Sequence, residues 1–135
     1  MADELTLEIV TPERVIFKGG VEEVTIPGTE GEFGVLKGHA PLLASVDYGE
    51  LSFIRDHTKT RYAVHSGYAE VSSSTVTVLA ESAERADQID RERATRAKER
   101  AEEKLVKLRK DDSEFERARL ALIRAVTRLN VATKS

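Results

Sequence analysis

Four arginines near the end of the chain have the spacing of a binding site for phosphate groups. Arg93 and Arg100 are seven residues apart, and Arg124 and Arg128 are four apart. On α-helices, each pair shares one flank. If two such helices run antiparallel, Arg93 lies near Arg128 or Asn130, and Arg100 lies near Arg124. Guanidinium groups gathered in this way repel one another unless an anion separates them, and their planar forks match phosphate oxygens.

The same arginines have a simpler interpretation. The first helix also carries Glu92, Glu99 and Glu103, which could pair with the arginines on a solvated charged face. The spacing alone therefore leaves both a polyphosphate site and an ordinary charged surface open.

Catalytic chemistry finds no support in the sequence. Cys is absent, the three histidines His39, His57 and His65 have no metal-ligand spacing, and no Gly-x-Ser-x-Gly motif occurs. The glycine-rich segment 28–34 carries two glutamates and no Lys-Ser or Lys-Thr pair, so it would repel phosphate rather than bind it. We therefore expect no catalytic residues, no metal site and no enzymatic activity. A small β-sandwich enzyme acting on nucleotides fails on the same grounds.

A break in composition near Ala83 shows which elements must position the arginines. All eight Gly and all three Pro precede this residue, and none follows it. Residues 1–83 hold six Lys and Arg against 13 Asp and Glu, whereas residues 84–135 hold 15 against 11. The chain thus combines an acidic part built of strands and turns with a basic part built of helix, and the two attract.

The first part predicts an antiparallel β-sandwich over residues 1–84. Apolar and polar residues alternate in Leu5–Val10, and turn residues such as Pro12 and Pro27-Gly28 separate short apolar runs. Further strands are expected at Val15–Phe17, Val21–Ile26, Phe33–Leu36, Leu42–Val46, Leu51–Arg55, Thr60–His65, Tyr68–Ser72 and Thr75–Leu79.

The second part predicts an antiparallel two-helix hairpin over residues 85–135, so the fold class is α+β in two segments. Asp87 or Asp90 can begin the first helix, and Ser113 followed by Glu116 has the form of a capping box for the second. Both apolar stripes consist mostly of Ala and Leu, so the hairpin buries little area by itself. It is either permanently docked on the sandwich or able to move between two states.

Bulk properties restrict location and partners. A formal net charge of −3 argues against nucleic acid as the main partner. No run of about 18 apolar residues occurs, and the acidic start is unlike a signal peptide. These features predict an intracellular protein, free or peripheral to a larger assembly.

The chain as a whole resembles the epsilon subunits of bacterial F-type ATP synthases. The resemblance covers Leu7 to about Ala132, and its motifs include residues 9–14, 27–36, 38–43, 62–64, 67–71 and 76–81. In the second part, the segment Ile89-Asp90-Arg91-Glu92-Arg93-Ala94 fits the family's ATP-binding motif Ile/Leu-Asp-x-x-Arg-Ala.

The resemblance implies a non-catalytic rotor subunit at the cytoplasmic face of the bacterial cell membrane. Its sandwich would bind the gamma subunit and the ring of c subunits, and so touch the membrane only indirectly. Its hairpin would bind one ATP as a regulatory ligand when folded, and would block ATP hydrolysis at the beta and alpha subunits when extended. The implied ATP-binding residues are Glu84, Ile89, Asp90, Arg93, Ala94, Arg100, Arg124 and Arg128. An alternative is the same subunit with a purely structural hairpin that binds no ATP.

Overall fold

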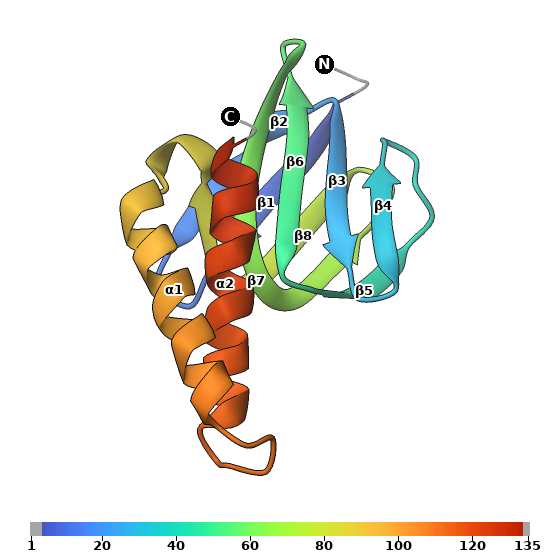
Figure 1. Ribbon diagram of the computed structural model, residues 1–135. Coiled ribbons are helices and arrows are strands. Elements are labelled where there is room, and N and C mark those ends of the chain that lie inside the picture. Colours follow the sequence, from blue (N-terminus) through green and yellow to red (C-terminus); the bar gives the residue numbers. More distant parts are fainter. Residues whose placement is uncertain (1–3, 134–135) are drawn as a thin grey trace.

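The computed structural model describes residues 4–133 and shows eight strands followed by two long helices (Figure 1). The strands are β1 Leu5–Val10, β2 Val15–Val21, β3 Glu23–Gly28, β4 Gly31–Val35, β5 Leu42–Val46, β6 Gly49–Arg55, β7 Thr58–Val71 and β8 Thr75–Arg85. A short 3₁₀ turn, η1 (Ala86–Gln88), leads into α1 (Arg91–Lys107) and α2 (Phe115–Thr133). The expected sandwich and helical hairpin are both present.

The strands form two layers around an apolar core. They are hydrogen bonded in the order β2-β1-β8-β7-β5-β3-β4, and β6 pairs with β3 and β7. All pairs are antiparallel except β1 with β8, which is parallel. Alternate residues of β1, of β3 and of the first half of β8 point inward. Leu7, Ile9, Ile26 and Leu51 are among the core residues with no exposed surface.

One long strand, β7, replaces the two that the sequence predicts at Thr60–His65 and Tyr68–Ser72. The Ser66-Gly67 pair reads as a turn, but the ladder to β8 continues across it from His65↔Ser82 to Gly67↔Ala80. Ser66 has a φ of 43° and Gly67 a φ of 149°, so the backbone is irregular at this pair, although the register to β8 does not shift. The first half of β7 pairs with β6 and the second half with β5, and the irregular pair lies where the two halves meet.

Two other expectations about the elements are wrong. The strand expected at Val21–Ile26 is interrupted at Glu22, so that β2 ends and β3 begins there. Helix α2 begins at Phe115, and Ser113 makes no side-chain hydrogen bond among residues 4–133. The turn is instead held by Asp112, whose carboxylate accepts the backbone N–H of Arg109 at 2.8 Å.

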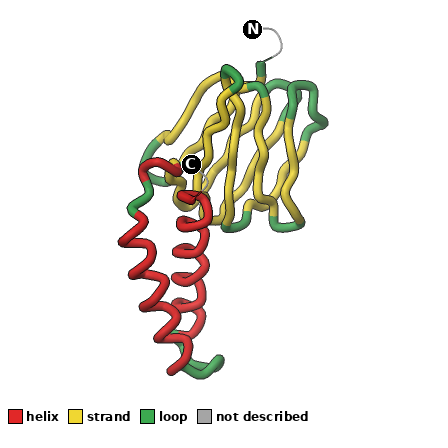
Figure 2. The backbone as a smooth tube through the Cα atoms, turned by 45° about the horizontal axis from the view of Figure 1, so that its top comes forward, coloured by secondary structure: helices red, strands yellow, loops and turns green. Residues whose placement is uncertain are grey.

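The hairpin lies against one side of the sandwich and extends beyond it (Figure 2). Helix α2 contacts β6 and β7, while α1 packs mainly on α2. The buried residues between the helices are small, and include Ala94, Ala101, Ala118 and Ala125. At the end of the hairpin that meets the sandwich, Val131 and Ala132 pack with Ala63. Arg91 donates a hydrogen bond to the carbonyl oxygen of Ala132 at 2.6 Å.

Candidate functional site

A cavity of about 270 Å³ lies where the end of β8 meets both helices of the hairpin. It is lined by Glu84, Asp90, Arg93, Ala94, Ala97, Arg100 and Arg128. Six of these seven are among the eight site residues expected from the sequence, and Ala97 is the addition. Residues from three elements therefore converge only because the hairpin is folded onto the sandwich.

Glu84 joins the sandwich to the second helix. It lies in β8 opposite Ala63, and its carboxylate accepts a hydrogen bond from Nε of Arg128 at 3.0 Å. Both side chains are a little over one-third exposed, so water screens the pair and its contribution to stability is small. Its main effect is to orient the Arg128 guanidinium at the cavity wall.

Asp90 begins the first helix. It is the N-cap of α1, and its carboxylate accepts the backbone N–H of Arg93 at 3.0 Å. This is the cap that the sequence predicts at either Asp87 or Asp90, and it places Arg93 and Ala94 in the first turn of α1. The amide groups of that turn carry partial positive charge, which favours an anion nearby.

Two of the three guanidinium groups at the cavity form no ion pair with another of the described residues. Within residues 4–133, neither Arg93 nor Arg100 makes an ion pair, whereas Arg128 pairs with Glu84. The cavity thus gathers three positive charges against two carboxylates, one of which is used as a helix cap. Unneutralised guanidinium groups beside a helix N-terminus suit a phosphate ligand.

The two remaining expected residues lie outside the cavity. Ile89 is 8% exposed and belongs to the apolar cluster with Ala63 and Val131. Arg124 lies with its guanidinium carbon 5.9 Å from the ring centroid of Tyr48, so it faces the sandwich rather than Arg100. The antiparallel register alone places Arg124 near Arg100, but it does not show the stacking partner that Tyr48 offers.

A buried histidine at the interface between sandwich and hairpin is absent from the expected site. His65 is 3% exposed, its Nδ1 lies 2.7 Å from Oγ of Ser82, and its ring centroid is 5.5 Å from that of Tyr48. Burial, followed by the positive charges of Arg128 and Arg124, lowers the pKa of His65 to about 4. Its sequence position, inside an apolar strand and far from both arginines, gives no signal of this contact.

Other kinds of site receive no support. Within residues 4–133, no group of three His, Asp or Glu side chains could hold a metal ion. In the same range, neither helix combines the length and apolar character needed to cross a membrane.

Comparison with known proteins identifies relatives over the whole chain. Residues 4–86 match the family model "ATP synthase, Delta/Epsilon chain, beta-sandwich domain", and residues 87–133 match "ATP synthase, Delta/Epsilon chain, long alpha-helix domain". The ATP synthase epsilon chain of Geotalea daltonii is 49% identical over all 135 residues and 98% of its own length. That of Syntrophobacter fumaroxidans is also 49% identical, with both chains fully covered.

Solved structures agree with this result. A chain of the Euglena gracilis mitochondrial ATP synthase, in a structure of OSCP, F1 and the c-ring, superposes with a TM-score of 0.83 at 25% identity. The match covers 97% of this chain and 82% of that one. A chain from the central stalk and c-ring of the Tetrahymena thermophila enzyme shares the fold at 11% identity and a TM-score of 0.54, with 96% and 94% covered.

Proposed function

Because the chain belongs to the ATP synthase delta/epsilon chain family over both of its domains, we propose that it is a non-catalytic rotor subunit of an F-type ATP synthase. In this role it couples the catalytic head to the c-ring at the cytoplasmic face of the cell membrane. The full-length identity of 49% to bacterial epsilon chains is the observation that carries the proposal.

An exposed apolar surface on the sandwich supports a docking role. Leu43 is 72% exposed, Tyr68 59% and Leu79 53%, and Tyr68 pairs directly with Leu79 in the sheet. Exposed apolar side chains that gather on one face of a sheet favour burial against a partner. We assign this face to the gamma subunit and the c-ring.

A charge placed on that face tests the assignment. We expect Tyr68→Glu to abolish co-purification of the chain with gamma, because a carboxylate cannot be buried there unpaired. His57→Glu is the matched control, since His57 is 95% exposed at a distant loop. Normal co-purification of the Tyr68→Glu chain would refute the docking face.

The hairpin is proposed to sense ATP. The cavity at Arg93 and Arg100 would hold its phosphates, and a second cavity of about 230 Å³ shares Ala97 and Arg100 and continues along the seam between the helices. Extension of the hairpin separates the arginines of α1 from Arg128. ATP would therefore favour the folded state, by about 2.7 kcal/mol at a concentration a hundredfold above its dissociation constant.

Calorimetry on the purified full chain tests ATP binding. Arg93→Ala should weaken the affinity for ATP by about tenfold or more, since a charge-assisted contact with phosphate contributes about 1.5–3 kcal/mol. Arg96→Ala is the matched control, because Arg96 lies on the same helix, outside the cavity, 4.0 Å from Glu92. Equal affinities in the wild type and both variants would remove the site.

The second candidate is the same subunit with a structural hairpin. It is favoured by the fact that both carboxylates of the cavity already have partners in the protein, since Glu84 binds Arg128 and Asp90 caps α1. The proposed regulation requires that the extended hairpin inhibit ATP hydrolysis by the assembled enzyme and that ATP relieve the inhibition. Inhibition of the reconstituted enzyme to the same extent at low and high ATP would favour the structural hairpin instead.

A further inference from the structure

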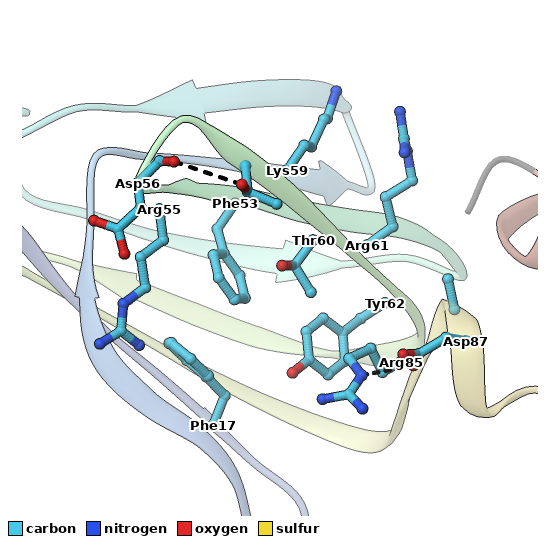
Figure 3. A pocket seen from close by; sticks show the side chains of 12 residues that line it. Phe17, Phe53, Arg55, Asp56, Lys59, Thr60, Arg61, Tyr62, Arg85 and Asp87 are labelled. Carbon is cyan, nitrogen blue, oxygen red and sulfur yellow. Dashed lines mark hydrogen bonds and ion pairs between the residues drawn. The ribbon is translucent and has the colours of Figure 1, made fainter.

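A hollow on the sandwich, away from the proposed ATP cavity, is larger than both cavities described above. It has a volume of about 770 Å³ and opens between β2, the β6–β7 hairpin and the end of β8 (Figure 3). None of its lining residues belongs to the ATP cavity or to the exposed face at Leu43, Tyr68 and Leu79. It therefore requires a separate explanation.

A length of strand edge beside this hollow is unpaired. The ladder between β7 and β8 ends at Tyr62↔Arg85, where the chain leaves the sheet and enters η1. The first four residues of β7, 58–61, continue beyond that point and pair only with β6 among residues 4–133. The position where β8 would continue is thus open, and extended segments bind to such edges by adding a strand.

The inner side of this position is mainly apolar, with the ion pair of Arg85 and Asp87 at its edge. Thr60 and Tyr62 point into the hollow together with Phe53 and Phe17 (Figure 3). The ring centroids of Phe17 and Phe53 are 4.5 Å apart, and those of Phe53 and Tyr62 are 6.0 Å apart. Every second side chain of an added strand would face these rings.

The outer side is basic, although the sandwich as a whole is acidic. Lys59 and Arg61 point away from the rings, and Arg55 lies over Phe17 at the mouth of the hollow. Arg61 is paired with Glu50 of β6 at 3.4 Å, so Lys59 and Arg55 are the charges available to a partner. These three are half of the six Lys and Arg in residues 1–83. Within residues 4–133, neither Lys59 nor Arg55 forms an ion pair, so both can receive a carboxylate.

From this geometry we propose that the open position beside residues 58–61 binds an extended segment of a partner polypeptide in which acidic and apolar residues alternate. Its backbone pairs with β7, its apolar side chains cover Phe53 and Thr60, and its carboxylates meet Lys59 and Arg55. The outer charges select acidic over basic segments. The inference does not depend on ATP binding by the hairpin.

Nuclear magnetic resonance on the ¹⁵N-labelled full chain tests the proposal. The probes are the capped peptide Glu-Val-Glu-Val-Glu, its lysine counterpart Lys-Val-Lys-Val-Lys, and inorganic pyrophosphate. The acidic peptide is expected to shift the amides of residues 58–62 and 85–87, with an affinity that falls as salt is added. The lysine peptide is expected to leave them unchanged.

Two charge reversals provide the matched comparison. Lys59→Glu should weaken binding of the acidic peptide by at least tenfold, while Lys37→Glu, on an exposed loop elsewhere, should leave it unchanged. Both side chains are exposed, so both variants are expected to fold. Equal binding of the two peptides, no shifts at millimolar acidic peptide, or the same shifts with pyrophosphate alone would overturn the proposal.

Discussion

Acidification should release the hairpin from the sandwich, because His65 is buried in its neutral form. Its ring lies under α2 between Tyr48 and Ser82, and Arg124 and Arg128 of that helix add positive charge nearby. When the hairpin leaves, both arginines leave with it and the imidazole meets water. The pKa of His65 should then return toward its ordinary value near 6.5.

The sign and size of the effect follow from linkage. The pKa of His65 is lower in the docked state, so docking is fully stable above about pH 6.5 and weakens as the pH falls toward 4. With a His65 pKa of about 4 in the docked state and 6.5 in the released state, the equilibrium constant for docking falls about tenfold between about pH 7.5 and about pH 5.5. That is about 1.4 kcal/mol of docking free energy.

Fluorescence energy transfer between a dye on the hairpin and a dye on the sandwich measures this docking equilibrium. The chain has no Cys, so dyes on Val106→Cys and Lys37→Cys report the distance between the hairpin and the sandwich specifically. Val106 is 86% exposed and Lys37 is exposed, so labelling leaves the interface intact. His65→Gln keeps a hydrogen-bonding group for Ser82 and cannot gain a charge, and should be insensitive to pH in this range.

A proton titration of the histidine rings completes the experiment. We expect the His65 signals to titrate near pH 4 in the docked chain. The reasoning is refuted if His65 titrates at its ordinary pKa while docked. It is also refuted if the His65→Gln chain releases its hairpin to the same extent as the wild type.

Three further predictions concern stability. Gly67→Ala should destabilise the chain by about 3 kcal/mol or more in urea unfolding, because a methyl group there would overlap the carbonyl oxygen of Leu79 at a φ that suits glycine; little loss would show that the backbone there can shift. Ala125→Leu should weaken the packing of the hairpin by about 1–3 kcal/mol, since Ala125 is 1% exposed. An unchanged free energy of unfolding would show that the two helices pack loosely enough to accept the larger side chain. Asp90→Ala should cost about 1 kcal/mol and lower the helical circular dichroism, while Asp90→Asn, which keeps a cap, should not; equal effects would contradict capping.

Local sequence patterns predicted most of the helices and strands, but not where every strand begins and ends. Alternation in residues 5–10 and capping by Asp90 depend on neighbours in the sequence, and both are present. The merging of two expected strands into β7 depends on what lies opposite Gly67, namely Leu79 and Ala80. The sequence around Ser66-Gly67 is compatible with a turn or with a continuous strand, and only the partner strand distinguishes them.

The candidate site was predictable where helix periodicity governs it. Arg93, Arg100 and Arg128 reach one cavity because their spacing and the antiparallel return of the chain bring them together. The stacking of Arg124 on Tyr48 and the burial of His65 join residues that are 76 and at least 59 positions apart. Such contacts depend on how the hairpin docks, which no short-range pattern encodes.

The small side chains between the helices imply that the two parts of the chain melt at different temperatures. Methyl groups of Ala94, Ala101 and Ala118 bury little apolar area, so α1 and α2 draw much of their order from the sandwich below them. The hairpin should lose its helical structure on warming while the sandwich stays folded. Calorimetry would then record two separate heat-absorption steps. The helices of the chain would then unfold at a lower temperature than its β-sheet.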